Sequence, residues 1–277
     1  MKNLTRTMLL AAVAISAQAQ SKTVEMEYMT WPEIKRAIQE EGKTTAIFFN
    51  GGTEQRGPQG ITATHTFIGR TLAREIAEKL GNALAAPVLP YSPANANKDL
   101  PGTIGIPIPL FAAINEHIAE QLIANGFKNV VLLGDSGGGQ QELGQIATKL
   151  TEKYKAQGIR VIHAPDVYLK VRNDFNQWAA ENGYPAGSHA SLKDTSEMLY
   201  LGGDKWIRKE LLPTAVGDPV RKPGEPRDPN AKRINNGISG DARRSTPEIG
   251  KKVHEMKLNY AVAQIRQLLG ESTASAK

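Results

Sequence analysis

Two glycine-rich loops of this chain carry polar side chains that could do chemistry. Residues 51–58 (GGTEQRGP) supply Glu54 and begin one residue after an apolar run, and residues 134–138 (GDSGG) supply Ser136 directly after another. Glycine allows backbone and ligand to approach closely. Parallel sheets place their sites on loops beyond the carboxyl ends of the strands. We therefore expect the two loops to meet around one cavity.

The second loop fits the pattern Gly-x-Ser-x-Gly, which presents the nucleophile of α/β-hydrolases where a strand turns into a helix. Ser136 would be that nucleophile, with an acid and then a histidine later in the chain. The candidates for these partners are Asp166, Asp174 or Asp194 with His189 or His254. Trypsin-like proteases contain the same five residues, but in a fold of β-barrels that does not match a strand–helix context. The alternative interpretation is a tight turn whose glycines admit a ligand or pack the helix on the sheet.

The first 19 residues have the pattern of an export signal. Lys2 and Arg6 supply a positive start, residues 8–15 an apolar core, and residues 17–19 a small-x-small cleavage site. The apolar core is too short to span a bilayer as a permanent helix. We predict a signal peptide over residues 1–19 and one domain over residues 20–277, in a secreted or periplasmic protein.

The composition excludes several classes of function. The 277 residues contain no cysteine, which rules out disulfides, thiolate zinc sites and cysteine nucleophiles. The net charge of +6 falls to +4 when the two positive charges of Lys2 and Arg6 leave with the signal. Basic residues are interleaved with acidic ones, and the densest basic stretch, 221–244, is rich in Pro and Gly, as in a solvated loop. We expect a small-molecule substrate as the partner, and neither nucleic acid nor, after signal removal, a membrane.

Helical and strand patterns alternate along the rest of the chain. The spacing predicts helices over residues 31–41, 67–80, 110–125, 141–156, 195–201 and 246–269, and strands over residues 43–49, 86–89, 129–133 and 159–164. Residues 216–240 are predicted to be an irregular loop. Strands that are apolar on both faces and alternate with helices predict a single-domain three-layer α/β/α sandwich with a mostly parallel sheet.

Five short segments follow one known family in order and spacing. They are residues 51–59 (GGTEQRGPQ), 100–103 (LPGT), 134–139 (GDSGGG), 189–196 (HASLKDTS) and 237–243 (GISGDAR). These resemble the motifs GxxEQHGPH, FPGT, NGHGGN, HAGxxETS and GxxGDPR of the creatininase family of amidohydrolases, and the agreement extends over residues 31–269. The resemblance implies a creatininase-like fold, hydrolysis of an amide or cyclic amide C–N bond of a small polar molecule, and a homo-oligomer.

The resemblance also implies a metal centre, in which a metal-bound water attacks an amide that the metals polarise. Glu54 keeps the first ligand position, and His65 stands where the family has an acid. With Asp135 or Asp194, these residues would hold one divalent metal ion, Zn or Mn. His189 matches the family's proton-handling histidine, and Asp194 the acid five residues later.

Other family ligands are replaced, which argues against a two-metal centre. Arg56, Gln59 and Ser136 stand where histidines are expected, and arginine cannot coordinate a cation. Arg56 could instead pair with Glu54 or hold a substrate carboxylate. We expect Arg56, Gln59, Gly137 and Gly138 to bind the substrate. Three hypotheses remain open: a hydrolase with an altered metal site, a metal-independent serine hydrolase that uses Ser136, and a non-catalytic small-molecule binding protein.

Overall fold

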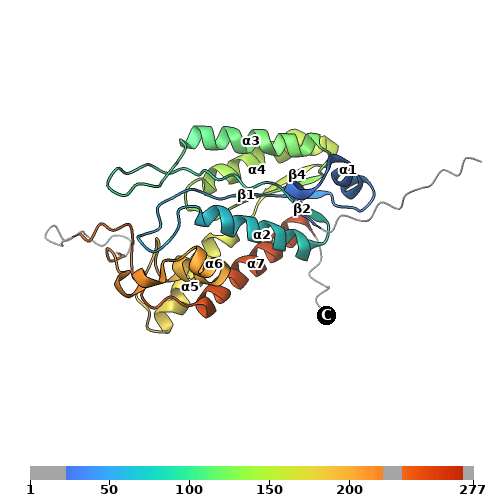
Figure 1. Ribbon diagram of the computed structural model, residues 1–277. Helices are drawn as coiled ribbons and strands as arrows, with labels where there is room; N and C mark the ends of the chain where they lie inside the picture. Colours follow the sequence, from blue (N-terminus) through green and yellow to red (C-terminus); the bar gives the residue numbers. More distant parts are fainter. Residues whose placement is uncertain (1–22, 221–232, 271–277) are drawn as a thin grey trace, which may run out of the picture.

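The computed structural model describes residues 23–220 and 233–270 (Figure 1). The predicted signal peptide over residues 1–19 lies outside the described residues, as does the middle of the predicted loop 216–240. Helices cover both faces of one sheet, so the predicted three-layer α/β/α sandwich is confirmed.

Four parallel strands form the sheet, in the order β2-β1-β3-β4. Their bounds are β1 (Thr45–Asn50), β2 (Ala83–Ala85), β3 (Asn129–Gly134) and β4 (Arg160–His163). Strands β1 and β3 lie side by side at the centre, in a register that pairs Asn50 with Gly134. Because both strands end at the same level, the loops that follow them leave the same edge of the sheet.

Side chains of the two central strands alternate between two cores. On one face, Phe48 and Leu132 pack under α1 (Trp31–Gln39), α3 (Ile108–Ala124) and α4 (Gln140–Tyr154). On the other face, Phe49 and Leu133 pack under α2 (Thr64–Leu80) and α7 (Pro247–Leu269). Figure 1 shows the sheet between these two layers. Burial of both faces explains why the strands are continuously apolar in sequence.

Two further helices, α5 (Leu169–Glu181) and α6 (Leu192–Gly202), lie on the α7 side. Short 3-10 helices complete the chain: η1 (Met26–Tyr28), η2 (Lys155–Gln157), η3 (Pro165–Val167), η4 (Gly203–Lys205) and η5 (Lys209–Thr214). The predicted start of α1 is confirmed, because the Thr30 N–H donates to Glu33 Oε2 at 2.7 Å in a capping box. No helix in the described ranges combines the length and apolar character needed to cross a bilayer.

Three elements differ from the sequence prediction. The strand expected at residues 86–89 is β2, three residues earlier, and Leu89 makes only an isolated bridge with Asn50. Helix α5 was not predicted, although Val171, Phe175 and Ala179 have helical spacing and are buried. Helix α2 begins at Thr64 instead of residue 67, so His65 lies in its first turn and its side chain is fixed by a helix.

Candidate active site

A cavity of about 200 Å³ lies at the carboxyl edge of the sheet. It brings together side chains from both glycine-rich loops, from the start of α2 and from the segment that enters α6. Its lining residues are Glu54, Arg56, His65, Asp135, Ser136, Gly137, Tyr168, Ser188, His189, Lys193 and Asp194. The structure thus gathers Glu54, Ser136, His65 and His189 around one polar cavity.

The Arg56 guanidinium is the common partner of the ionisable groups in this cavity. Its NH1 lies 3.1 Å from His189 Nδ1 and 3.4 Å from Asp194 Oδ2, and its NH2 lies 2.5 Å from His65 Nε2. Glu54 Oε2 is 3.8 Å from NH1. Only 3% of the Arg56 side chain is exposed, and its buried Nε has no hydrogen-bond partner. Arg56 therefore holds its positive charge inside the site and not at its rim.

Behind His65, a chain of buried charges reaches α7. His65 Nδ1 is 2.8 Å from Asp135 Oδ2, and Asp135 Oδ1 accepts from Lys257 Nζ at 2.5 Å. Lys257 also donates to Glu197 of α6, at 2.6 Å. Burial would raise the pKa of Asp135, but Lys257 and His65 outweigh it and hold that pKa far below its usual range. Burial would likewise lower the pKa of Lys257, and the two carboxylates raise it instead.

The carboxylates that face the cavity are ionised. Burial acts to raise the pKa of Glu54, but the hydrogen bond with His65 and the charge of Arg56 lower it to about 2. Burial likewise acts to raise the pKa of Asp194, but the charges of Lys193 and Arg56 outweigh it and hold that pKa below its usual range. Asp194 accepts hydrogen bonds from Arg56 and from the Ala190 N–H, at 3.0 Å. It therefore orients the guanidinium, and hydrogen-bonds no histidine in the described part of the chain.

His189 has both ring nitrogens engaged. Its Nε2 is 2.9 Å from the Gln55 carbonyl oxygen, which assigns the ring proton to Nε2, and its Nδ1 then accepts from Arg56. Burial, followed by the charge of Arg56, lowers the pKa of His189, so the ring is uncharged at neutral pH. Ala190, the next residue, is fully buried with φ +51, an uncommon conformation for a residue with a Cβ.

Ser136 lines the cavity without a base beside it. Its Oγ accepts from the Gly138 N–H at 3.3 Å, and no imidazole hydrogen-bonds it among the described side chains. His254 is held elsewhere, 2.7 Å from Glu75 and 3.4 Å from Glu197. A serine nucleophile needs an adjacent general base. The geometry therefore does not support the triad that the Gly-x-Ser-x-Gly pattern suggested.

Two residues that were predicted to bind substrate do not line the cavity. Gln59 is fully buried, and its amide donates to the Ala190 carbonyl oxygen at 2.8 Å and to Thr195 Oγ1 at 3.1 Å. A Cβ at Gly138 would lie 2.8 Å from the Pro93 carbonyl oxygen. The absence of a side chain at Gly138 therefore allows the backbone at Pro93 to pack against it. Gln59 instead supports the strained Ala190 and thereby the position of His189.

Sequence reasoning also missed three residues of the site. Ser188 and Lys193 line the cavity, and Lys257 supports it from behind. Lys193 lies at an unspecified position of the HASLKDTS segment, and Lys257 is a charged residue at a position that helical spacing places on an apolar face. The one available signal is the apolar neighbourhood of Lys257 on α7, where Val253, Leu258 and Ala261 are buried.

The side chains of the cavity, as they are arranged, do not fit a metal ion. Arg56 NH2 lies within 3.2 Å of both ring nitrogens of His65, whose Nδ1 also contacts Asp135, and Nδ1 of His189 faces Arg56 as well. Within residues 23–220 and 233–270, no three His, Asp or Glu side chains are placed to hold a metal ion. The predicted Zn or Mn site on Glu54, His65 and Asp135 has no support in this geometry. Arg56, which cannot act as a ligand, contacts His65 Nε2, and Asp135 is already paired with His65 and Lys257.

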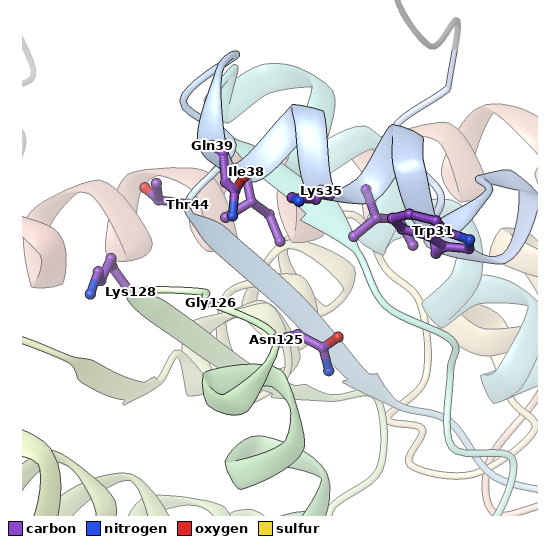
Figure 2. A pocket seen from close by; sticks show the side chains of 9 residues that line it. Trp31, Lys35, Ile38, Gln39, Thr44, Asn125, Gly126 and Lys128 are labelled. Carbon is purple, nitrogen blue, oxygen red and sulfur yellow. The ribbon is translucent and has the colours of Figure 1, made fainter.

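A larger cavity, of about 450 Å³, lies at the opposite edge of the sheet (Figure 2). It is bounded by α1 and by the segments that lead into β1 and β3, and Trp31, Thr44 and Lys128 are among its lining residues. No carboxylate or imidazole lines it. Its lysines stand without the carboxylates and imidazoles that gather at the smaller cavity, so we place the chemistry there.

Comparison with known proteins identifies relatives with this architecture. A family model described as "Creatininase: Creatinine amidohydrolase" matches residues 27–265. A crystal structure of creatinine amidohydrolase (creatininase) is 21% identical, with a TM-score of 0.70 over 90% of this chain and 98% of that one. A putative creatinine amidohydrolase from Bacteroides fragilis NCTC 9343 is 17% identical, with a TM-score of 0.67 over 92% of this chain and 100% of that one. A structure titled "Creatininase Mn" is 20% identical, with a TM-score of 0.70 over 89% of this chain and 99% of that one. No curated protein matches the chain.

Proposed function

This chain belongs to the creatininase family, and from that premise we propose that it hydrolyses an amide or cyclic amide C–N bond of a small polar molecule, with fixed side-chain charges in place of metal ions. Family and fold support an amidohydrolase-type function. The observation that carries the finer proposal is the buried Arg56 guanidinium among Glu54, His189 and Asp194.

The cations of the cavity suit the charge that an amide develops during hydrolysis. Lys193 Nζ lies 3.4 Å from Asp194 Oδ1, and Asp194 also holds Arg56, so two positive groups share one acid. A carbonyl oxygen placed against them is stabilised as it becomes an oxyanion, and removing one such donor typically slows turnover by about 10²–10³-fold. The same cations stabilise the carboxylate product.

Glu54 and His189 complete the reaction in this proposal. Glu54, with 28% of its side chain exposed, accepts a hydrogen bond from the attacking water, whose oxygen bonds to the carbonyl carbon. The C–N bond breaks, and a proton from that water passes through His189 to the leaving nitrogen, which gives a carboxylic acid and an amine. For His189 to carry the proton, its Nδ1 must exchange the Arg56 hydrogen bond for one to the reactants.

A second candidate function is ligand binding without catalysis. Two observations favour it: a carboxylate with a pKa of about 2, such as Glu54, is a weak base, and His189 has no free ring nitrogen. The cavity would then hold a small polar molecule against Arg56 and Lys193, in the same place as the substrate of the hydrolase.

A product assay separates the two candidates. Tag-free protein is incubated with a panel of small cyclic and linear amides, including creatinine, the substrate named for the relatives, and products are followed by NMR. We expect slow hydrolysis that survives a chelator, falls about 10²-fold or more in Arg56→Met, and is unchanged in Arg74→Met, an arginine on the outside of α2. Saturable thermal stabilisation by a panel compound that yields no product would favour the binding protein.

We also propose that the protein works outside the cytoplasm, on the strength of the predicted signal over residues 1–19. The intact mass of the protein from the periplasmic fraction tests this. A mature chain that begins at residue 20 supports export, and a full-length cytoplasmic chain contradicts it.

A further inference from the structure

The cavity of Figure 2 has the form of a small-molecule pocket. Its volume of about 450 Å³ is more than twice that of the candidate active site, and ligand pockets in proteins usually measure roughly 300–1,000 Å³. Trp31, Ile34 and Ile38 of α1 give it an apolar wall, because residues three or four positions apart lie on one face of a helix. The segment that leads into β3 forms the other side. The space is therefore large enough for one small molecule with an apolar part.

The charged side chains that line this cavity are all positive. They are Lys35 of α1 and Lys128, the residue before β3, and no carboxylate or imidazole lines the cavity with them. Neither ammonium group has an ion pair or hydrogen bond with any residue in the ranges 23–220 and 233–270. Arg36, the next residue of the helix, is by contrast paired with Glu41 at 2.9 Å. An apolar wall beside two unpaired cations is complementary to a molecule that joins an apolar part to an anion.

Trp31 is the most exposed large apolar residue in the described part of the chain, at 76%. The other two tryptophans, Trp178 and Trp206, each pack against another aromatic ring. Trp31 makes no ring or cation–π contact with any described residue, although the capping box at Thr30 fixes its place in the first turn of α1. Leaving an indole in water is unfavourable, and a planar ligand stacked on it would cover it. The position of Trp31 on the wall of the cavity thus favours an aromatic ligand.

From these features we propose that the cavity is a second ligand site of the protein, which binds a small aromatic anion with its ring against Trp31 and its charge between Lys35 and Lys128. Thr44 lines the same space, and its hydroxyl, which has no hydrogen-bond partner among the described residues, donates to the anion. An aromatic carboxylate and an aromatic phosphate ester both present this chemistry. The site lies at the opposite edge of the sheet from the candidate active site, so its occupant takes no part in the proposed hydrolysis.

Calorimetric titration of tag-free protein tests the proposal. The probes are benzoate and phenyl phosphate, with benzamide as the uncharged analogue and acetate as the anion that lacks a ring. We expect one equivalent of benzoate or phenyl phosphate to bind more tightly than about 1 mM, and benzamide and acetate to bind at least about 10-fold more weakly. The bound ring should also reduce the quenching of tryptophan fluorescence by acrylamide, and this reduction should disappear in Trp31→Phe, which keeps an aromatic face but loses the reporting indole.

Substitutions then locate the bound molecule. Lys35→Gln and Lys128→Gln should each weaken binding by about 10-fold, and because both lysines are exposed these changes leave the fold intact. The matched control Lys251→Gln, at an exposed lysine of α7, should leave binding unchanged. Lys193→Gln alters the candidate active site and should also leave it unchanged.

Three results would overturn the proposal: no saturable binding of either aromatic anion, binding that survives the loss of both Lys35 and Lys128 or is removed by Lys193→Gln, and benzamide that binds as tightly as benzoate. A preference for benzoate or for phenyl phosphate supports the site and identifies which anion it takes. Because the readout is binding and not turnover, the result stands whether or not the proposed hydrolysis is found.

Discussion

Replacing Lys257 by methionine should destabilise the protein strongly. Methionine keeps the length and apolar stem of lysine and removes only the ammonium, which lies 2.5 Å from Asp135 and 2.6 Å from Glu197. All three side chains are at most 3% exposed, so water cannot replace the lost partner. Breaking a buried ion pair from one side typically costs about 3–5 kcal/mol, and here two carboxylates lose their cation, so we expect at least about 4 kcal/mol.

That loss is large against the whole stability of a domain, about 5–15 kcal/mol. For a chain of this size, 1 kcal/mol corresponds to roughly 2–4 °C, so the melting temperature should fall by about 8–16 °C. Urea unfolding followed by circular dichroism gives the free energy, and calorimetry gives the melting temperature. Lys251→Met, on the exposed side of the same helix, is the matched control and should change the stability by less than about 0.5 kcal/mol.

The pH dependence identifies the cause of the loss. Without Lys257, burial raises the pKa of Asp135, and protonation then relieves the unpaired charge. The deficit of Lys257→Met relative to wild type should therefore shrink as the pH falls from 8 to 5. A Lys257→Met protein within about 1 kcal/mol of wild type, or a deficit that is constant over that range, would refute the reasoning.

Three further predictions concern other parts of the molecule. Burial alone would lower the pKa of His254, but hydrogen bonds to carboxylates outweigh it and raise the pKa to about 9. In wild type the stability that this provides is complete below pH 6.5, and about 3 kcal/mol of it is lost as the pH rises through 9. Urea unfolding of His254→Gln should show no such loss. The same pH dependence of the unfolding free energy in wild type and His254→Gln would contradict this. Gly250→Ala in α7 should lower the stability by more than about 2 kcal/mol in thermal unfolding, because its Cβ would lie 1.9 Å from the Ser196 carbonyl oxygen. Gly144→Ala in α4 should instead raise the stability by about 0.5–1 kcal/mol, because its Cβ would meet nothing closer than 3.5 Å. Effects of the same sign in the two variants would contradict the packing of α7 against α6. Glu54→Gln should lower turnover by about 10²-fold with little change in KM, and an effect on KM alone would assign it to substrate binding.

The fold was predictable because its signals are local. The runs that form β1 and β3 are buried on both faces, and the glycines after them mark the ends of the strands. Parallel pairing of those strands then brings Glu54 and Asp135 to one edge of the sheet. The convergence of the two loops on one cavity follows from these facts alone.

The electrostatics of the site was not predictable in the same way. The sequence placed Arg56 in the site, but not its contacts with His189 and Asp194, which lie more than 130 residues later. Helical spacing places Lys257 on the apolar face of α7, between Val253 and Ala261, but only the packing of α7 identifies Asp135 as its partner. Such partners are chosen by tertiary packing, and residue type and spacing do not encode them.

The position of Lys257 on the last helix also has a consequence for how the chain reaches its native state. The ribosome makes Asp135 and Glu197 before α7. The cation that allows these two carboxylates to be buried together, Lys257, comes only with α7. An emerging polypeptide that ends before α7 would therefore keep this edge hydrated and open, because burying uncompensated acids is costly. Closure depends on contacts between segments about 120 residues apart, which are slow to form. The cavity can therefore form only after α7 has been synthesised.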